Sequence, residues 1–257
     1  MDFDLLVHEA WPAYEQRAHD GWILRYAGGV TKRANSVLPL GRPADLRAAI
    51  GAAEAFYGER GQRCVFSMGP GATPGLDEEL ERRGYERVDP TLVMAAPSLV
   101  PPGQAQRAGA EERAGAEEQA GAEEQAGAEG RVRIEDGPWA GWLDTWWSVD
   151  GRYESGLAHA ARICAGVPAW YAAYEEDGET LAVGRAVPQG GTLGIYCMAT
   201  RPEARRRGLA RTILRALARH AGAGSAYLVV TAPNQAAQSL YRREGFEVTA
   251  RYHYRVR

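Results

Sequence analysis

The chain has 257 residues, of which 45% are hydrophobic and 25% charged, and its formal net charge is −3. This composition is typical of a globular protein with a core of its own, and so small a net charge gives no reason to expect a nucleic-acid partner. Because no uncharged apolar run reaches about 18 residues, we expect no transmembrane helix and no membrane partner. The start of the chain, Met1 to Asp4, carries acids rather than a basic region, which argues against a secretory signal.

The cysteines argue against a metal site and against a disulfide framework. Cys64, Cys164 and Cys197 are odd in number and widely spaced, without the spacing of metal ligands. We therefore expect reduced thiols in a cytoplasmic protein, no metal site and no disulfide framework.

Residues 1–100 alternate between predicted strands and helices. The pair Gly28-Gly29 marks a turn after the first strand. The predicted strands are 22–26, 36–40, 63–68 and 91–95, and the predicted helices are 44–59 and 76–83.

Residues 101–130 differ from the rest of the chain. After Pro101-Pro102, a hexapeptide that begins RAGAEE at Arg107 is repeated four times, without any aromatic or large aliphatic side chain. Such a segment cannot bury enough apolar surface to offset its ordering entropy, and a glycine in each repeat disfavours helix. We therefore predict a flexible, solvated linker, with an interaction segment as the alternative, between domains 1–100 and 131–257.

Residues 131–257 give the clearer pattern. Asp177-Gly178 is the tip of a predicted hairpin. The predicted helices are 139–149, 154–165, 208–220 and 234–244, and the predicted strands are 169–174, 181–187, 193–200, 226–231 and 246–256. Helices interleaved with strands of this kind predict an α/β (α+β) fold with a mixed central β-sheet flanked by helices.

One segment has the chemistry of an anion site. Arg205, Arg206, Arg207 and Gly208 join a predicted strand to a predicted helix. The first turn of a helix offers unpaired N–H groups and the positive end of the helix dipole, and glycine lets an anion approach the backbone closely. Guanidinium groups suit phosphate oxygens. Taken alone, the same residues also fit a solvated turn.

Two motifs together resemble the GNAT superfamily of acyl-CoA-dependent N-acetyltransferases. The family's (Arg/Gln)-x-x-Gly-x-(Gly/Ala) loop reads Arg205-Arg-Arg-Gly208-Leu-Ala210 here, after the Pro-Glu entry of Arg201-Pro-Glu203. Downstream, the sequence from Asn234 through Leu240-Tyr241 to Gly245-Phe246 matches a second signature of the family. The order and spacing of these pieces are more specific than any one of them.

The resemblance implies a set of roles. The backbone from Arg206 to Ala210, Leu209 included, would hold the CoA pyrophosphate, with Arg205 at the start of that loop. The strand end Met198, Ala199 and Thr200 would pair with the pantetheine arm. Asn234 would hydrogen-bond acetyl-CoA, and Tyr241, two helical turns further on, would donate a proton to the leaving thiolate. The alternative for Tyr241 is an aromatic ring packed beneath its helix.

The acceptor side is less defined. An amine must lose a proton before it attacks the thioester, and Glu154, His159 and Tyr196 are candidates for the base. Cys197 is better explained as a core thiol than as a nucleophile, because no histidine is placed to activate it. Four tryptophans between Trp139 and Trp147 form either core contacts or part of an acceptor pocket.

Residues 1–100 resemble the same family only in part. The loop after Leu40 reads Gly41-Arg-Pro-Ala-Asp45, and no Asn and Tyr match the pair of the second half. We therefore predict a tandem GNAT protein whose first domain is degenerate and borders the acceptor site of the second. Gly28, Arg33 and Asn35 either contribute to that border or form a turn.

These features predict an N-acetyltransferase that transfers an acetyl group from acetyl-CoA to a small-molecule or amino-acid-like amine. The alternatives are a protein N-terminal or lysine acetyltransferase and a non-catalytic acyl-CoA-binding module. Nucleic-acid binding through Arg201 to Arg211 ranks last, because no broader basic surface accompanies it. The sequence does not specify the acceptor, the acyl chain length or the oligomeric state.

Overall fold

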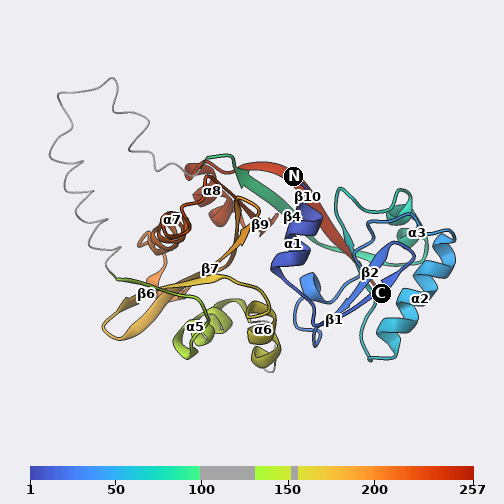
Figure 1. The fold of residues 1–257 in the computed structure, drawn as a ribbon, viewed down its shortest axis with the longest axis horizontal. Coiled ribbons are helices and arrows are strands. Elements are labelled where there is room, and N and C mark those ends of the chain that lie inside the picture. Colours follow the sequence, from blue (N-terminus) through green and yellow to red (C-terminus); the bar gives the residue numbers. More distant parts are fainter. Residues whose placement is uncertain (99–130, 152–155) are drawn as a thin grey trace, which may run out of the picture.

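The computed structural model describes residues 1–98, 131–151 and 156–257, and these form two lobes side by side along the long axis of the molecule (Figure 1). The first lobe contains α1 (Phe3–Ala10), β1 (Glu15–His19), β2 (Trp22–Tyr26), the 3-10 turn η1 (Lys32–Ala34), α2 (Leu46–Gly58), β3 (Val65–Met68), α3 (Leu76–Arg82) and β4 (Glu86–Ala96).

The second lobe is built mostly from the chain after residue 130. Its elements are β5 (Val132–Glu135), α5 (Ala140–Asp150), α6 (Leu157–Cys164), β6 (Trp170–Glu176), β7 (Glu179–Gln189), β8 (Thr192–Thr200), the 3-10 turn η2 (Pro202–Ala204), α7 (Leu209–Ala221), β9 (Ser225–Thr231), α8 (Gln235–Arg243) and β10 (Glu247–Val256).

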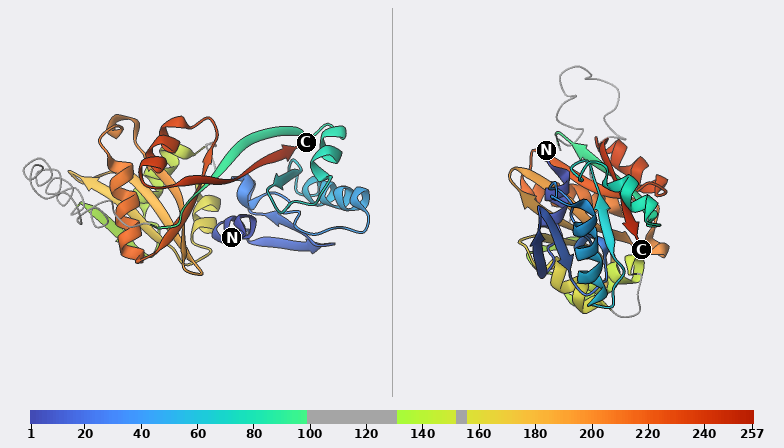
Figure 2. Two further views of the ribbon diagram at one scale, coloured as in Figure 1. Left: turned by 90° about the horizontal axis from the view of Figure 1, so that it is seen from above. Right: turned by 90° about the vertical axis from the view of Figure 1, so that its right-hand side faces the viewer.

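One eight-stranded sheet passes through both lobes, in the order β3-β10-β4-β9-β8-β7-β6-β5. All neighbours are antiparallel except β8 and β9, which run parallel. The long strands β4 and β10 run from one lobe to the other (Figure 2). The end of β4 pairs with β9, while the end of β10 pairs with β3 in the first lobe. Each half of the chain therefore supplies a strand to the sheet of the other.

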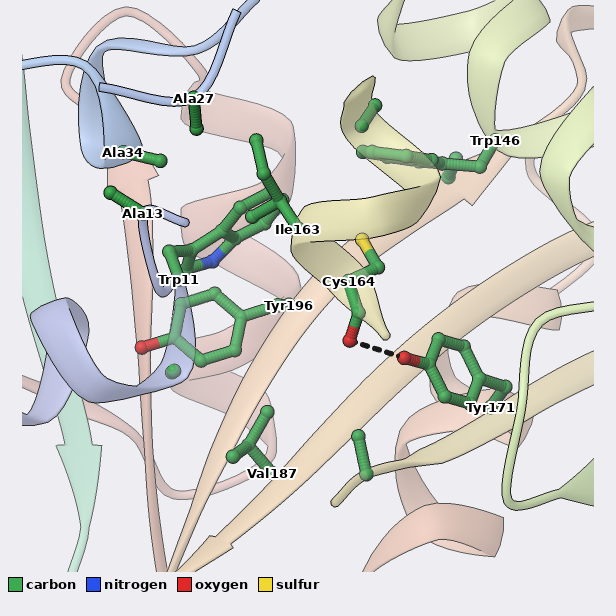
Figure 3. Close-up of a cluster of buried hydrophobic side chains, with 14 of the residues drawn as sticks. Trp11, Ala13, Ala27, Ala34, Trp146, Ile163, Cys164, Tyr171, Val187 and Tyr196 are labelled. Carbon is green, nitrogen blue, oxygen red and sulfur yellow. Dashed lines mark hydrogen bonds between the residues drawn. The ribbon is translucent and has the colours of Figure 1, made fainter. Parts of the chain in front are cut away.

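Two apolar layers cover the sheet in the second lobe. On one face α5 and α6 pack with Trp11 and Tyr196, and Figure 3 shows Trp11 of the first lobe inserted among side chains of the second. On the other face, α7 buries Leu209, Ile213, Leu214 and Leu217. A third cluster lies within the first lobe, beneath α2. Helices therefore cover both faces of the sheet in the second lobe.

The mixed sheet with flanking helices confirms the predicted fold class. Asp177 and Gly178 have φ values of 51° and 79°, as the two central residues of the predicted hairpin turn require. The sequence patterns did not predict α1, β1 or β5. The predicted strand at 36–40 is wrong as a strand, because only Val37 and Leu38 pair, in isolated bridges.

Two further predictions concern the linker and the absence of a transmembrane helix. The predicted linker, residues 101–130, lies outside the described residues. Within the residues described, no helix is long and apolar enough to cross a membrane.

Candidate active site

The parallel strands β8 and β9 pair only at their beginnings. Thr192 to Ile195 face Ser225 to Leu228, and the recorded pairing between the two strands ends there. A bulge follows at once, since Cys197 has φ 53° and the register of β8 against β7 shifts between Val183 and Arg185. Beyond the bulge, β9 pairs with β4 and β8 keeps only β7. The predicted residues Met198, Ala199 and Thr200 thus form a strand end with one free backbone edge.

The loop after β8 presents consecutive backbone N–H groups. Arg206 and Gly208 have φ values of 67° and 80°, while Arg207 between them does not have a positive φ. Among the described residues, no hydrogen-bond acceptor is recorded for the N–H groups from Arg206 to Ala210. Such an alternation turns successive N–H groups toward one point and forms a nest for an anion. Because Leu209 begins α7, the helix dipole adds to the positive potential there.

The arginine side chains of this loop are exposed. Arg207 donates to Glu176 Oε2 over 2.6 Å, and Arg205 lies 3.4 Å from the carbonyl of Thr200. The segment therefore combines a backbone nest with exposed cationic side chains, an arrangement that suits a pyrophosphate. Glu176 would have to release Arg207 if that guanidinium bound a phosphate.

The predicted pair on α8 lies at the start and near the end of that helix. Asn234 is the N-cap, and its Oδ1 accepts from the Ala237 N–H over 3.1 Å. Tyr241 is 7% exposed and packs against Phe246, with 5.9 Å between ring centroids. Burial raises the pKa of Tyr241 to about 12, so the phenol carries its proton throughout the neutral range. A protonated phenol can act as a general acid, and the same burial fits a packing role.

Two of the three candidate bases are described by the structure. His159 Nδ1 lies 2.7 Å from the hydroxyl of Tyr14, and the Tyr196 hydroxyl lies 2.7 Å from that of Tyr227. Burial raises the pKa of Tyr196 well above its ordinary value, so this phenol is poorly suited to accept a proton from an amine. Glu154 lies outside the described residues.

Cys197 lies beside a second thiol at the bulge of β8. Its side chain contacts Cys164 at the end of α6, and burial raises the pKa of the Cys197 thiol well above its ordinary value. A thiol that keeps its proton is a weak nucleophile. This environment agrees with the predicted core role and counts against a covalent intermediate on Cys197.

The tryptophan cluster divides between core and cavity. Trp142 is fully buried, and its Nε1 donates to the carbonyls of Ala172 and Gly184 over 3.1 and 3.2 Å. Trp146 and Trp147 instead line a cavity of about 80 Å³ between the two lobes. The first lobe contributes Trp11, Val30, Thr31, Lys32 and Arg33 to this cavity, and α5 also contributes Asp150.

The segment 27–35 forms the predicted turn, and one of its residues lines the cavity between the lobes. Asn35 Oδ1 accepts from the N–H groups of Ala27 and Gly29 over 2.6 and 2.9 Å, which fixes the turn. At Gly28 a Cβ atom would lie 2.5 Å from the ring of His159, so only glycine allows this close approach to α6. Arg33 lines the cavity. Gly28 and Asn35 therefore shape the turn, and Arg33 borders the candidate acceptor site.

Arg185 is a structural residue that the sequence reasoning missed. It is fully buried on β7, and its Nη1 and Nη2 donate to the carbonyls of Ala10 and Cys164 over 2.9 and 2.7 Å. The side chain thereby ties α1 and α6 to the sheet. A single charged residue inside the apolar strand Leu181 to Val187 was the signal in the sequence.

Comparisons with known proteins agree with this arrangement. The family model described as "Probable histone acetyltransferase Rv0428c C-terminal" matches residues 6–255. The uncharacterized N-acetyltransferase YobR of Bacillus subtilis (strain 168) is 27% identical over 263 residues, which cover 98% of this chain and 96% of YobR.

Solved structures share the fold at low sequence identity. A GCN5-related N-acetyltransferase from Kribbella flavida superposes with a TM-score of 0.62 at 18% identity, over 95% of this chain and 89% of that one. A tandem GNAT protein from the clavulanic acid biosynthesis pathway gives a TM-score of 0.58 at 12% identity, over 100% of this chain and 87% of that one. The chain therefore belongs to the family described as probable histone acetyltransferase Rv0428c C-terminal, and it is an acetyltransferase of the GNAT type.

Proposed function

We propose that this chain transfers an acetyl group from acetyl-CoA to a primary amine of a small-molecule or amino-acid-like acceptor, by direct attack within one ternary complex. The observation that carries the proposal is the separation of β8 from β9 after Ile195, on the strand whose following loop forms the nest at residues 206–210. A free strand edge followed by an anion nest suits an extended thioester with a pyrophosphate at its far end.

The donor would be held mainly by backbone groups. The N–H groups from Arg206 to Ala210 would bind the pyrophosphate, with the guanidinium groups of Arg205 and Arg207 nearby. The free edge of Met198, Ala199 and Thr200 would pair with the amide groups of the pantetheine arm. Asn234 would contribute its side-chain NH₂ group, since its Oδ1 already caps α8. Within the described residues, no group of His, Cys, Asp and Glu is arranged to hold a metal ion.

The chemical step follows from these positions. A neutral amine attacks the thioester carbonyl and forms a tetrahedral oxyanion, which a backbone N–H near Met198 or Ala199 would stabilise. The attacking nitrogen passes one proton to a base or to water, the intermediate collapses, and the carbon–sulfur bond breaks with its electron pair on sulfur. Tyr241 would give the thiolate its proton, because burial keeps this phenol protonated at neutral pH.

A protein lysine or N-terminal acetyltransferase is the second candidate, favoured by the word histone in the description of the matching family. Against it stands the cavity of about 80 Å³, which residues of both lobes line and which suits a small group better than a peptide. If a peptide were the acceptor, a histone-tail peptide would compete with small amines for turnover. A non-catalytic acyl-CoA-binding module is the third candidate, and turnover with any amine would exclude it.

The experiment is an amine screen in which the release of the CoA thiol is followed with a chromogenic disulfide. We expect thiol release that depends on both acetyl-CoA and a small primary amine. No release with any small amine, together with release on histone-tail peptides, would contradict the small-molecule acceptor. No release in either case by a folded protein that binds acetyl-CoA would favour the non-catalytic module.

A further inference from the structure

The cavity between the lobes lies next to the place where the strands separate. It is lined by Trp11 and the segment 30–33 of the first lobe, and by Trp146, Trp147 and Asp150 of α5. Thr231, the last residue of β9, also lines it, three positions before Asn234. The cavity is therefore open to the same end of β9 that borders the proposed donor site.

The charged side chains of this cavity differ in whether they have an ion-pair partner. Lys32 Nζ is already paired with Asp89 Oδ2 over 2.8 Å. In contrast, neither Arg33 nor Asp150 has an ion-pair partner among the residues that the structure describes. A cavity with one guanidinium and one carboxylate, each without an ionic partner, suits a ligand that carries both charges.

Of the two residues, Arg33 gives the stronger evidence for a bound ligand. Its Nε atom is buried without a hydrogen-bond acceptor in the described part of the chain, and the guanidinium lies 5.7 Å from the centre of the Trp11 ring. Trp11 and Trp146 line the same cavity, and each has a buried indole nitrogen without a recorded acceptor. Buried donors and charges are normally paired, because an unpaired buried group has lost its hydrogen bonds to water without replacement. A buried guanidinium with an unpaired donor, at a cavity that it lines, suits an anionic ligand.

Asp150 supplies the complementary charge. It lies at the last position of α5, and its carboxylate is close enough to Cys197 on the bulge of β8 to act on the charge of that thiol. It is also within electrostatic reach of Arg33. Trp146 and Trp147 also line the cavity, and indole rings attract ammonium groups.

We infer that the cavity binds an amino-carboxylic acid, with Arg33 on the carboxylate and Asp150 with Trp146 and Trp147 on the amino group. The inference rests on the proposed function, since it specifies the acceptor class of the same site. Arg33 and Asp150 are then determinants of specificity rather than groups that take part in acetyl transfer. A volume of about 80 Å³ favours a short acid over a long peptide.

The test uses the full chain without acetyl-CoA, so that binding is separated from transfer. Intrinsic tryptophan fluorescence and calorimetry would follow titration with L-alanine, 4-aminobutanoate and 6-aminohexanoate, each against the matched amine without a carboxylate. We expect at least one acid to bind about ten-fold or more tightly than its matched amine, the effect of one charged hydrogen bond. Equal binding of acid and amine in all three pairs, or no binding of any acid, would overturn the inference.

Variants assign the effect to Arg33. Arg33→Gln should weaken binding of the preferred acid about ten-fold and leave the matched amine unchanged, while Arg33→Lys should restore part of the affinity. Arg47→Gln, which changes an exposed arginine on α2, is the control and should alter neither. Equal weakening of acid and amine by Arg33→Gln would contradict the assignment. If Arg33→Gln fails to fold, the acid–amine difference in the wild type and in Arg33→Lys decides.

A failure of the proposed function would look different. In that case the acid binds with the expected preference, Arg33→Gln removes the preference, and no amine is acetylated in the presence of acetyl-CoA. The binding inference then stands and the transfer chemistry does not.

Discussion

The loop at residues 205–210 and the cavity between the lobes are the two halves of the proposed reaction, and they are built in opposite ways. The loop is continuous in sequence, exposed, and made largely of backbone N–H groups. The cavity collects side chains from Trp11 to Tyr254 and is lined by both lobes. Binding of a common donor needs only a backbone shape, whereas choice of an acceptor needs particular side chains from distant segments.

The largest expected effect comes from breaking the loop. Gly208→Glu places a carboxylate at the nest and a side chain at φ 80°, so we expect the affinity for acetyl-CoA to fall by about 10³-fold or more. Calorimetry with acetyl-CoA measures this. The matched control is Gly178→Glu, which has φ 79° and equally open surroundings in the hairpin turn between β6 and β7. If both variants lost binding equally, backbone strain rather than the nest would be responsible.

The next effect tests the chemical step between the two regions. Tyr241→Phe should lower kcat by about 10²-fold, as loss of a general acid does, and leave the affinity for acetyl-CoA nearly unchanged. Because the pKa of Tyr241 is about 12, the phenol loses its proton only above pH 11, and kcat should show no decline from this group between pH 7 and pH 10. Stopped assays across that pH range measure kcat of the wild type and of the variant at each pH. A phenylalanine variant with the wild-type kcat would show that Tyr241 only packs.

A third variant tests the support of the cavity side. Arg185→Leu leaves the Ala10 carbonyl without its side-chain donor, while the Cys164 carbonyl keeps the Tyr171 hydroxyl over 2.6 Å. We therefore expect a cost of about 1–3 kcal/mol in the free energy of unfolding, mainly from the Ala10 carbonyl. Arg185→Lys can reach one of the two and should lose less. Urea denaturation measures the change. An unchanged midpoint for Arg185→Leu would mean that the apolar contacts of Trp11 alone hold α1 in place.

The smallest effect concerns the end of β10 in the first lobe. Asp77 accepts from Arg255 Nε over 2.8 Å and lies 2.9 Å from His253 Nε2, and the hydrogen bond from Arg255 lowers the pKa of Asp77. A lowered pKa means that this stabilisation is present above the ordinary pKa and is lost as the pH falls through the lower value of the folded state. Because Asp77 is partly exposed, Asp77→Asn should cost only about 0.2–1 kcal/mol.

Denaturation at pH 7 and at pH 3 tests this contribution of Asp77. The difference between Asp77→Asn and wild type should shrink at the lower pH. A constant difference would place the effect in packing rather than in charge.

The contrast between a local loop and a cavity built from distant segments also explains which features could be predicted from the sequence. The residues from Arg205 to Ala210 and from Asn234 to Phe246 are local motifs, so their positions on α7 and α8 followed from short-range patterns. The pairing of β4 with β9, and of the end of β10 with β3, joins segments more than 100 residues apart and left no local signal. For the same reason the sequence named Arg33 and the tryptophans as separate candidates for an acceptor pocket, but not the other residues that line the cavity with them.

Buried polar residues were the other gap. Arg185 stood alone in an apolar strand, but nothing nearby in the sequence identified the carbonyls of Ala10 and Cys164 as its partners. Asp150 at the end of α5 was not among the predicted site residues, because its proposed role in ligand binding depends on Arg33 lining the same cavity. Such partners become visible only when the tertiary structure brings the segments together.

The most direct test of the account is the stoichiometry of acetyl-CoA binding to the full chain, measured by calorimetry. The account predicts about one equivalent, because the nest at residues 206–210 lies in the second lobe and the loop after Leu40 lacks the same pattern. Two equivalents would show that the first lobe has a donor site of its own. No binding by a well-folded sample would contradict the proposed donor site altogether.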